Sequence, residues 1–302
     1  MSGPSSPLRL AVTGREGQVV RALLDAAPAA GVTVIPLGRP DLDLENPASV
    51  AAAIAAARPD AVVNAAAYTA VDQAEKEPER AFAINAAGAG AVAAAAAGLG
   101  VPVLQISTDY VFDGTKPAPY VEDDPVGPSG VYGASKLAGE QAVAAATPNH
   151  AVLRTAWVYA PYGKNFVRTM LALGATRDEL RVVADQQGCP TYAPDIAAAV
   201  IAVARNLVAR PDEADLRGVF HMAGSAETDW ASFAEAIFAL SAARGGRAPA
   251  VVRIGTADYP TPARRPANSR LECGRLARLH GVRLPPWQAS LATCLDRLLV
   301  ET

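Results

Sequence analysis

The chain alternates short aliphatic runs with longer alanine-rich stretches. The aliphatic runs predict β-strands at residues 8–12, 32–37, 61–64, 101–107 and 151–154. The stretches between them predict helices at residues 17–27, 47–57, 75–98 and 132–146. This alternation is typical of parallel strands joined by right-handed helical crossovers. It predicts an α/β fold, a Rossmann-like doubly wound parallel sheet, whose ligands bind beyond the carboxyl ends of the strands.

The alternation loosens after Arg154, where proline and glycine interrupt shorter segments. We expect residues 1–155 to form a dinucleotide-binding domain and residues 156–302 to form mainly a smaller C-terminal α/β substrate domain. Further strands are predicted at residues 180–183 and 219–222, and a helix at 195–209. The segment of about 180–223 is expected to return to the first domain, so that the two domains are interleaved.

The first predicted strand runs into a glycine turn and then a helix. Gly14 and Gly17 stand where a backbone turns sharply and approaches a pyrophosphate, and the helix that follows offers free N–H groups to that anion. Two glycines can also mark an ordinary loop, but the preceding strand favours the phosphate site. The third glycine of the fuller pattern is Val20 here, so the helix must pack on the strand in a different way.

The end of the second predicted strand carries the signal for the type of dinucleotide. An acidic residue there binds an adenosine ribose, whereas an arginine can neutralise a 2′-phosphate. Arg39 comes first, ahead of Asp41 and Asp43. The order favours NADPH, with NADH as the alternative cofactor, and the competing interpretation of Arg39 is a solvated loop charge.

Tyr132 and Lys136 are spaced to share one face of a predicted helix. A free tyrosine has a pKa of about 10, and a nearby cation stabilises its phenolate, so this pair suits proton transfer near neutral pH. A solvent-facing pair is the alternative. Thr108 ends the fourth strand, where a hydroxyl can polarise a substrate carbonyl or simply cap the strand. Asn64 and the alanines after it, at the end of the third strand, leave room for a cofactor, although Asn64 is also a common turn residue.

Composition narrows the function class. The 302 residues are 51% hydrophobic and carry a net charge of −3, so nucleic-acid binding is not expected. Three widely spaced cysteines argue against a disulfide framework and favour a cytoplasmic location. Residues 1–7 lack the pattern of a secretion signal. The uncharged run from 81 to 108 is long enough for a membrane span, but its glycines and Pro102 favour a buried helix followed by a buried strand.

Taken together, the motifs resemble the extended short-chain dehydrogenase/reductase family, and within it the reductases of dTDP-linked deoxysugar synthesis. The resemblance covers most of the chain. The segments that carry it are residues 17–19, 64–75, 107–114, 132–136, 154–159, 185–191, 220–224, 228–233 and 265–269. It implies that the chain passes a hydride from NADPH to a keto group of a nucleotide-linked deoxysugar, a small-molecule partner.

The resemblance also assigns roles to residues. It implies that Thr108, Tyr132 and Lys136 carry catalysis and that Thr108, Asp109 and Trp157 contact the sugar nucleotide. Trp157 could equally be a core residue. The cofactor is expected to lie against Gly14, Gly17, Gln18, Val19, Arg39, Asp43, Leu44, Ala66, Ala67, Tyr68, Tyr132 and Lys136.

No metal site is expected, because His150, His221 and His280 have no ligand partners close in sequence. Some members of the family are described as Mg²⁺-linked dimers that use glutamates, one of them in the helix after the glycine turn. Residues 20–23 of this helix contain no carboxylate, so a metal-bridged dimer is not expected. A homodimer of another kind stays open.

Two other functions remain as alternatives. One is a different nucleotide-sugar reductase or epimerase of the same family, which would share the catalytic residues and differ in the sugar pocket. The other is a non-catalytic NADP-binding regulatory subunit on this fold, as is known for a subunit of methionine adenosyltransferase. The presence of both Tyr132 and Lys136 favours catalysis.

Overall fold

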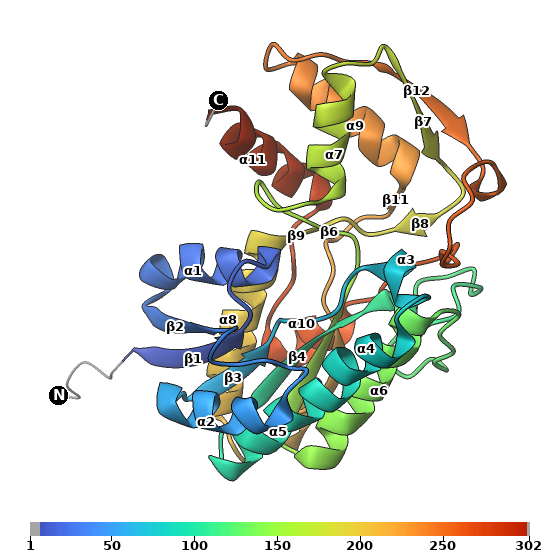
Figure 1. The fold of residues 1–302 in the computed structure, drawn as a ribbon. Coiled ribbons are helices and arrows are strands. Elements are labelled where there is room, and N and C mark those ends of the chain that lie inside the picture. Colours follow the sequence, from blue (N-terminus) through green and yellow to red (C-terminus); the bar gives the residue numbers. More distant parts are fainter. Residues whose placement is uncertain (1–6, 301–302) are drawn as a thin grey trace.

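The computed structural model describes residues 7–300, and a six-stranded parallel sheet forms its centre (Figure 1). The prediction that the chain has no secretion signal rests on residues 1–7, and residues 1–6 lie outside the described part of the chain. The sheet is built from β1 (Leu8–Thr13), β2 (Val32–Leu37), β3 (Ala61–Asn64), β4 (Val103–Thr108), β5 (His150–Thr155) and β10 (Gly218–His221). The predicted doubly wound α/β fold is confirmed.

The order of the strands places a topological switch point in the sheet. The order is β10-β5-β4-β3-β1-β2, so the chain runs outward in one direction from β1 to β2 and in the other from β3 onward. β1 pairs with both β2 and β3. The connections therefore diverge between β1 and β3, and in open α/β sheets this topological switch point is where ligands bind.

Helices cover both faces of the sheet and bury its aliphatic side chains. One face packs against α1 (Gln18–Ala30), α8 (Ala193–Ala209) and α10 (Gly274–His280). The other packs against α2 (Pro47–Ala57), α5 (Ala89–Gly98) and α6 (Val131–Ala146). Successive residues of β1 show the division, because Leu10 and Val12 belong to the first core and Ala11 to the second. Burial on both faces explains why the strands are almost wholly aliphatic.

A second group of elements forms a smaller lobe beyond the carboxyl ends of the strands (Figure 1). Its core is aromatic and includes Tyr159, Phe233 and Trp287. Its helices are α7 (Phe166–Gly174), α9 (Trp230–Ala242) and α11 (Trp287–Val300). Its strands pair in twos: β6 (Val158–Tyr159) with β9 (Thr191–Tyr192), β7 (Glu179–Val183) with β12 (Ala250–Ile254), and β8 (Gln187–Gly188) with β11 (Thr228–Asp229).

One expected boundary is wrong. The strand β7 was expected to begin the return to the main sheet, but it pairs with β12 in the smaller lobe. Within the segment of about 180–223, the chain returns to the large domain with α8, which packs against α1, and with β10, which pairs with β5. The exposed and buried residues of β7 alternate, which is typical of a strand with one solvated face and not of a strand in the central sheet.

The stretch predicted as one helix at residues 75–98 is divided. The stretch comprises α4 (Pro78–Phe82), the π-helix η1 (Ala83–Gly88) and α5, and a separate short helix, α3 (Val71–Ala74), ends just before it. Residues Pro78–Gly98 form the one described helical run that is long and apolar enough to cross a membrane. In the structure this run packs against α2, α6 and the sheet, as expected for a helix of the core. The 3-10 helix η2 (Asp109–Val111) follows β4.

Candidate active site

The glycine turn after β1 has the geometry of a phosphate-binding loop. Gly14 has a φ of 98°, which an L side chain rarely adopts, and its N–H donates to the Leu37 carbonyl at 2.6 Å. A Cβ at Gly14 would lie 3.3 Å from Val20 Cγ2, so Val20 packs onto the turn where the fuller pattern has glycine. Gly17 precedes α1 and no side chain caps the helix. The free N–H groups of the first turn fit an anionic pyrophosphate.

The basic residue expected at the end of β2 is already paired. The exposed Arg39 guanidinium donates to both carboxylate oxygens of Asp43, at 2.7 and 3.0 Å, and also to Glu45. The Arg39 hydrogen bond lowers the pKa of the Asp43 carboxyl. A second cation, missed from the sequence, lies beside them: the Arg15 side chain runs over Gly38 and donates to Asp41 at 2.7 Å. Arg15 and Arg39 therefore flank the end of β2 together.

A buried chain of amide and hydroxyl groups links the strands at the switch point. Thr13 donates to Asn64 Oδ1 at 2.6 Å, and Asn64 Nδ2 donates to Gln105 Oε1 at 2.7 Å. The Thr13 hydroxyl also accepts from the backbone N–H groups of Ala65 and Ala66, at 3.1 and 3.0 Å. Asn64 is thus a tie between β1, β3 and β4. It therefore holds the segment after β3 in place, and it is not the exposed turn residue that the sequence also allowed.

The other residues predicted to contact the cofactor surround the same end of the sheet. Gln18 and Val19 open α1, and Gln18 Oε1 accepts from Asn165 of the smaller lobe at 3.0 Å. Leu44 is buried against the helix pair α2 and α5. Ala66, Ala67 and Tyr68 follow β3 directly. The Tyr68 hydroxyl donates to Glu77 at 2.8 Å, so its ring is held by α4 and its neighbours.

The three predicted catalytic residues come together where β4 ends and α6 begins. Lys136 is buried, and its Nζ donates to the Ile106 carbonyl of β4 at 2.7 Å. Burial raises the pKa of Tyr132 to about 12, and the Thr108 hydroxyl acts in the opposite direction. Burial lowers the pKa of Lys136 to about 8, and the Glu140 carboxylate opposes that change. Because Lys136 is only 4% exposed, the alternative of a solvent-facing Tyr132 and Lys136 pair is excluded.

Asn85 is a site-shaping residue that the sequence analysis did not single out. It is buried in the π-helix η1 and accepts from the Tyr68 N–H at 2.8 Å. Its Nδ2 donates to the Tyr68 carbonyl at 3.1 Å and to Ser135 Oγ at 3.0 Å. It therefore ties the segment after β3 to the helix of Tyr132. An isolated amide in an uncharged apolar run is the signal that would have found it, and π-helical turns often mark functional sites.

Asp109 lies directly after Thr108 and is buried. Burial raises the pKa of the Asp109 carboxyl to about 6, and the hydroxyls of Ser269 and Thr108 act against this. The next residue, Tyr110, meets the Tyr132 ring edge to face at 5.5 Å between centroids. A buried carboxyl, two phenols and a hydroxyl therefore share one region beside Lys136, which suits hydrogen bonding to a polar ligand.

Trp157 lies at the junction of the two lobes with a left-handed φ of 49°. Its ring stacks on Trp230, with centroids 3.5 Å apart and planes at 10°, so one face of the indole is covered by protein. Gly188 is packed against the same indole, since a Cβ there would lie 2.3 Å from Trp157 Cε2. The sugar contact predicted for Trp157 must therefore use the remaining edge or face of the ring.

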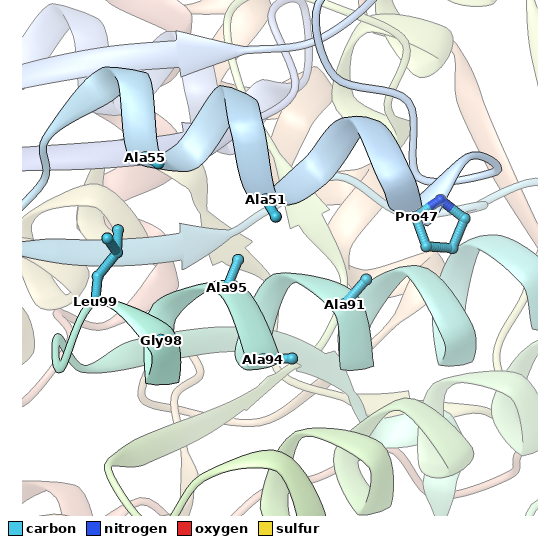
Figure 2. Close-up of a pocket in the computed structure, with 8 residues that line it drawn as sticks. All are labelled: Pro47, Ala51, Ala55, Ala91, Ala94, Ala95, Gly98 and Leu99. Carbon is cyan, nitrogen blue, oxygen red and sulfur yellow. The ribbon is translucent and has the colours of Figure 1, made fainter.

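A groove of about 480 Å³ lies between α2 and α5, and alanines dominate its walls (Figure 2). It contains none of the residues predicted to bind cofactor or substrate. Within residues 7–300, no group of three or more His, Cys, Asp and Glu side chains is placed to hold a metal ion.

Comparison with known protein sequences gives one consistent family. The family model described as RmlD substrate binding domain matches residues 8–300. A dTDP-4-dehydrorhamnose reductase from Sinorhizobium fredii is 55% identical over 294 residues, covering 97% of this chain and 99% of that protein. Another from Burkholderia thailandensis is 45% identical over 299 residues, covering 97% of this chain and 100% of that protein.

Solved structures agree. A dTDP-4-dehydrorhamnose reductase from Clostridium acetobutylicum superposes with a TM-score of 0.88 at 38% identity, covering 97% of this chain and 100% of that chain. The enzyme from Bacillus anthracis, solved in complex with NADP, gives a TM-score of 0.86 at 35% identity, with 98% and 100% covered. A UDP-glucose 4-epimerase from Thermus thermophilus, at 22% identity and a TM-score of 0.76 over 97% of this chain and 99% of that chain, shares the fold.

Proposed function

The chain belongs to the dTDP-4-dehydrorhamnose reductase family, and from this premise we propose that it reduces the 4-keto group of dTDP-4-dehydro-6-deoxy-L-mannose with NADPH. The product is dTDP-L-rhamnose. The family assigned from the sequence motifs is confirmed by the match over residues 8–300. The chain is accordingly an oxidoreductase that uses NADP, as the Bacillus anthracis relative does in its complex.

The observation that carries the proposal is the grouping at the end of β4. Tyr132, Lys136 and Thr108 lie together beside the switch point of the sheet, where the Gly14 turn and the uncapped start of α1 can hold a pyrophosphate. A proton donor therefore stands next to the place where a nicotinamide would lie. This geometry supports carbonyl reduction over a purely regulatory role.

Each of these residues has a task in the reduction. NADPH supplies the hydride that reaches C4 of the sugar. Tyr132 donates its phenolic proton to the oxygen of that carbon, and Thr108 orients the carbonyl by a hydrogen bond. Lys136, when protonated, stabilises the phenolate that Tyr132 becomes, and solvent then returns the proton. Arg39 and Arg15 hold the 2′-phosphate of the cofactor.

The sugar nucleotide is proposed to lie between the lobes. Asp109 accepts a hydrogen bond from a sugar hydroxyl, and the free part of the Trp157 indole packs against the apolar side of the deoxysugar. Two placements support this proposal: Asp109 follows Thr108 directly, and Trp157 lies just after β5, the strand that pairs with β4.

One assay separates this function from its alternatives. Pure protein is mixed with NADPH and dTDP-4-dehydro-6-deoxy-L-mannose while the absorbance of the cofactor is followed, and the product is identified by chromatography. The proposed enzyme consumes NADPH and forms dTDP-L-rhamnose. Turnover of another 4-keto nucleotide sugar in its place would assign a different reductase of the family. Tight NADPH binding by calorimetry without turnover of any such sugar would favour the regulatory subunit.

We also propose the setting in which the enzyme works. A nucleotide sugar and NADPH are both cytoplasmic metabolites, so the cytoplasm is the proposed location, with no nucleic-acid or membrane partner. A homodimer that needs no metal is the proposed assembly, and light scattering with and without a chelator tests it. A mass that falls when the chelator is added would show that a metal links the subunits.

A further inference from the structure

Glu140 continues the spacing of the two catalytic side chains along α6. Tyr132, Lys136 and Glu140 follow one another at intervals of four residues and so lie along one side of the helix. Lys136 and Glu140 are 4% and 5% exposed. A carboxylate so deeply buried needs partners of its own, since burying an unpaired charge costs several kcal/mol, roughly.

The partners of Glu140 come from two neighbouring strands. Ser107 of β4 donates its hydroxyl to Glu140 Oε1 at 2.5 Å. Arg154 of β5 donates Nε to Oε1 at 2.9 Å and an Nη2 proton to Oε2 at 2.7 Å, in a bidentate pair. Ser107 and Arg154 are directly opposite each other in the register of β4 and β5. One carboxylate thus binds both members of a cross-strand pair.

These contacts fix α6 against the end of β4 at three points. Lys136 bonds the carbonyl of Ile106, Glu140 bonds the side chain of Ser107, and Tyr132 lies by Thr108. Three consecutive strand residues therefore meet three helix residues that share one side. A slip of the helix along the strand would break all three contacts together.

We propose that Glu140, held by Arg154 and Ser107, is a positioning residue that keeps Lys136 protonated and in place while Tyr132 gives up its proton. The proposal rests on the reductase function above and adds to it a buried charge beyond the residues that touch substrate or cofactor. Glu140 acts through Lys136, because its own oxygens are occupied by strand residues.

The electrostatic reason is that Lys136 is buried. Burial lowers the pKa of Lys136 to about 8, and the Glu140 carboxylate is the charge that opposes this change. Without that carboxylate the ammonium would lose its proton nearer to neutral pH. A neutral Lys136 cannot stabilise the phenolate of Tyr132, so the reduction would slow at a pH where the native enzyme is still active.

Other charged and titratable groups lie on α6 and on the elements that pack against it. The elements packed against α6 are β4, β5, η1, η2, α3, α4 and α5. No charged residue occurs in β4, η1 or α5. The titratable groups on α6 and on the other elements are Tyr132 and Glu140 (α6), Arg154 and His150 (β5), Asp109 and Tyr110 (η2), Asp72 (α3), and Glu79 and Arg80 (α4). Among these, Glu140 is the anion that raises the pKa of Lys136.

The test compares a change of charge with a change of shape at one position. Glu140→Gln removes the charge and keeps the size, whereas Glu140→Asp keeps the charge and shortens the side chain. Ser107→Ala removes one hydrogen bond of Glu140 and leaves every charge in place. Unfolding temperatures and circular dichroism show which variants fold. Should Glu140→Gln not fold, Glu140→Gln with Arg154→Met removes both charges of the buried pair and takes its place.

The titration of Lys136 is read directly. The sequence has lysine at positions 76, 116, 136 and 164 only, so protein labelled with [ε-¹³C]lysine gives few signals, and Lys136→Met identifies the one of interest. In Glu140→Gln the pKa of Lys136 should fall by about one unit. In Glu140→Asp and Ser107→Ala it should stay near the native value. The alkaline limb of the kcat profile should move to lower pH by a similar amount in Glu140→Gln alone.

The outcomes distinguish the two proposals. A native pKa for Lys136 in the folded charge-free variant, or an equal fall in Glu140→Asp, overturns the role of Glu140 and shows a structural ion pair only. This measurement needs no substrate, so it holds even where native protein fails to reduce the sugar nucleotide. That failure would count against the proposed function and would leave the Lys136 titration to decide the role of Glu140.

Discussion

Gly133 follows Tyr132 at the start of α6, where this helix lies against η2. A Cβ added at Gly133 would lie 2.2 Å from the Tyr110 carbonyl oxygen and 3.0 Å from Pro128 Cβ. The first contact is with backbone, which cannot turn aside as a long side chain can. Gly133→Ala therefore forces the start of α6 away from η2.

The size of the effect follows from these distances. To restore an ordinary contact, α6 and η2 must separate by about 1 Å, a change typical of an overpacked core that costs about 1–3 kcal/mol. The same movement carries the Tyr132 phenol away from Thr108. A misplacement of about 1 Å at a reacting group can cost about 10²-fold in rate. Stability and kcat should therefore fall together, with kcat affected more.

The assay uses thermal unfolding and NADPH oxidation, with Gly98→Ala as the matched control. Gly98 ends α5 and a Cβ there meets nothing within 4 Å, so alanine should leave kcat unchanged and should not destabilise the protein. Gly133→Ala should lower the unfolding temperature by several degrees and kcat by about 10²-fold. Native kcat and stability in that variant would refute the close packing of α6 on η2 as the reason for glycine.

Four other substitutions have clear expectations. Tyr132→Phe should lower kcat by about 10² to 10⁴-fold and leave NADPH affinity intact, because only the proton donor is lost; near-native turnover would remove Tyr132 from its role. Arg39→Ala should weaken NADPH binding about tenfold by calorimetry with little effect on NADH, and Arg15→Ala should act in the same sense, since both cations flank the end of β2; an equal loss for NADH would contradict 2′-phosphate recognition. Trp157→Ala removes the stack on Trp230. It should lower the unfolding free energy by about 3 kcal/mol in denaturant titrations and should also raise the KM of the sugar nucleotide. A native unfolding free energy with a raised KM would make Trp157 a ligand contact alone.

Local sequence signals were enough to predict most of the strands and helices of the large domain. The strand of residues 32–37 and the helix of residues 47–57 were predicted with the bounds that the structure has. Both depend on short-range patterns: aliphatic runs for strands buried on both faces, and alanine-rich stretches for the helices that cover them. The segment of Glu179–Val183 was assigned to the wrong sheet, because pairing with a distant strand such as β12 leaves no local mark.

The candidate site shows the same division. The spacing of Tyr132 and Lys136 follows the helix period, and the turn at Gly14 requires a positive φ. Both features can therefore be predicted from the sequence alone. Asn85 and Arg15 were missed, because each acquires its role by contact with a segment far away in sequence.

What the sequence alone determined was therefore the family, the order of strands and helices, and the residue types of the candidate site. Only the tertiary structure decided which charges stand beside them. Glu140 meets Ser107 and Arg154 because β4 and β5 pair in one register and α6 packs on them in one position. Such a contact depends on two packings at once, and no period along the chain records it.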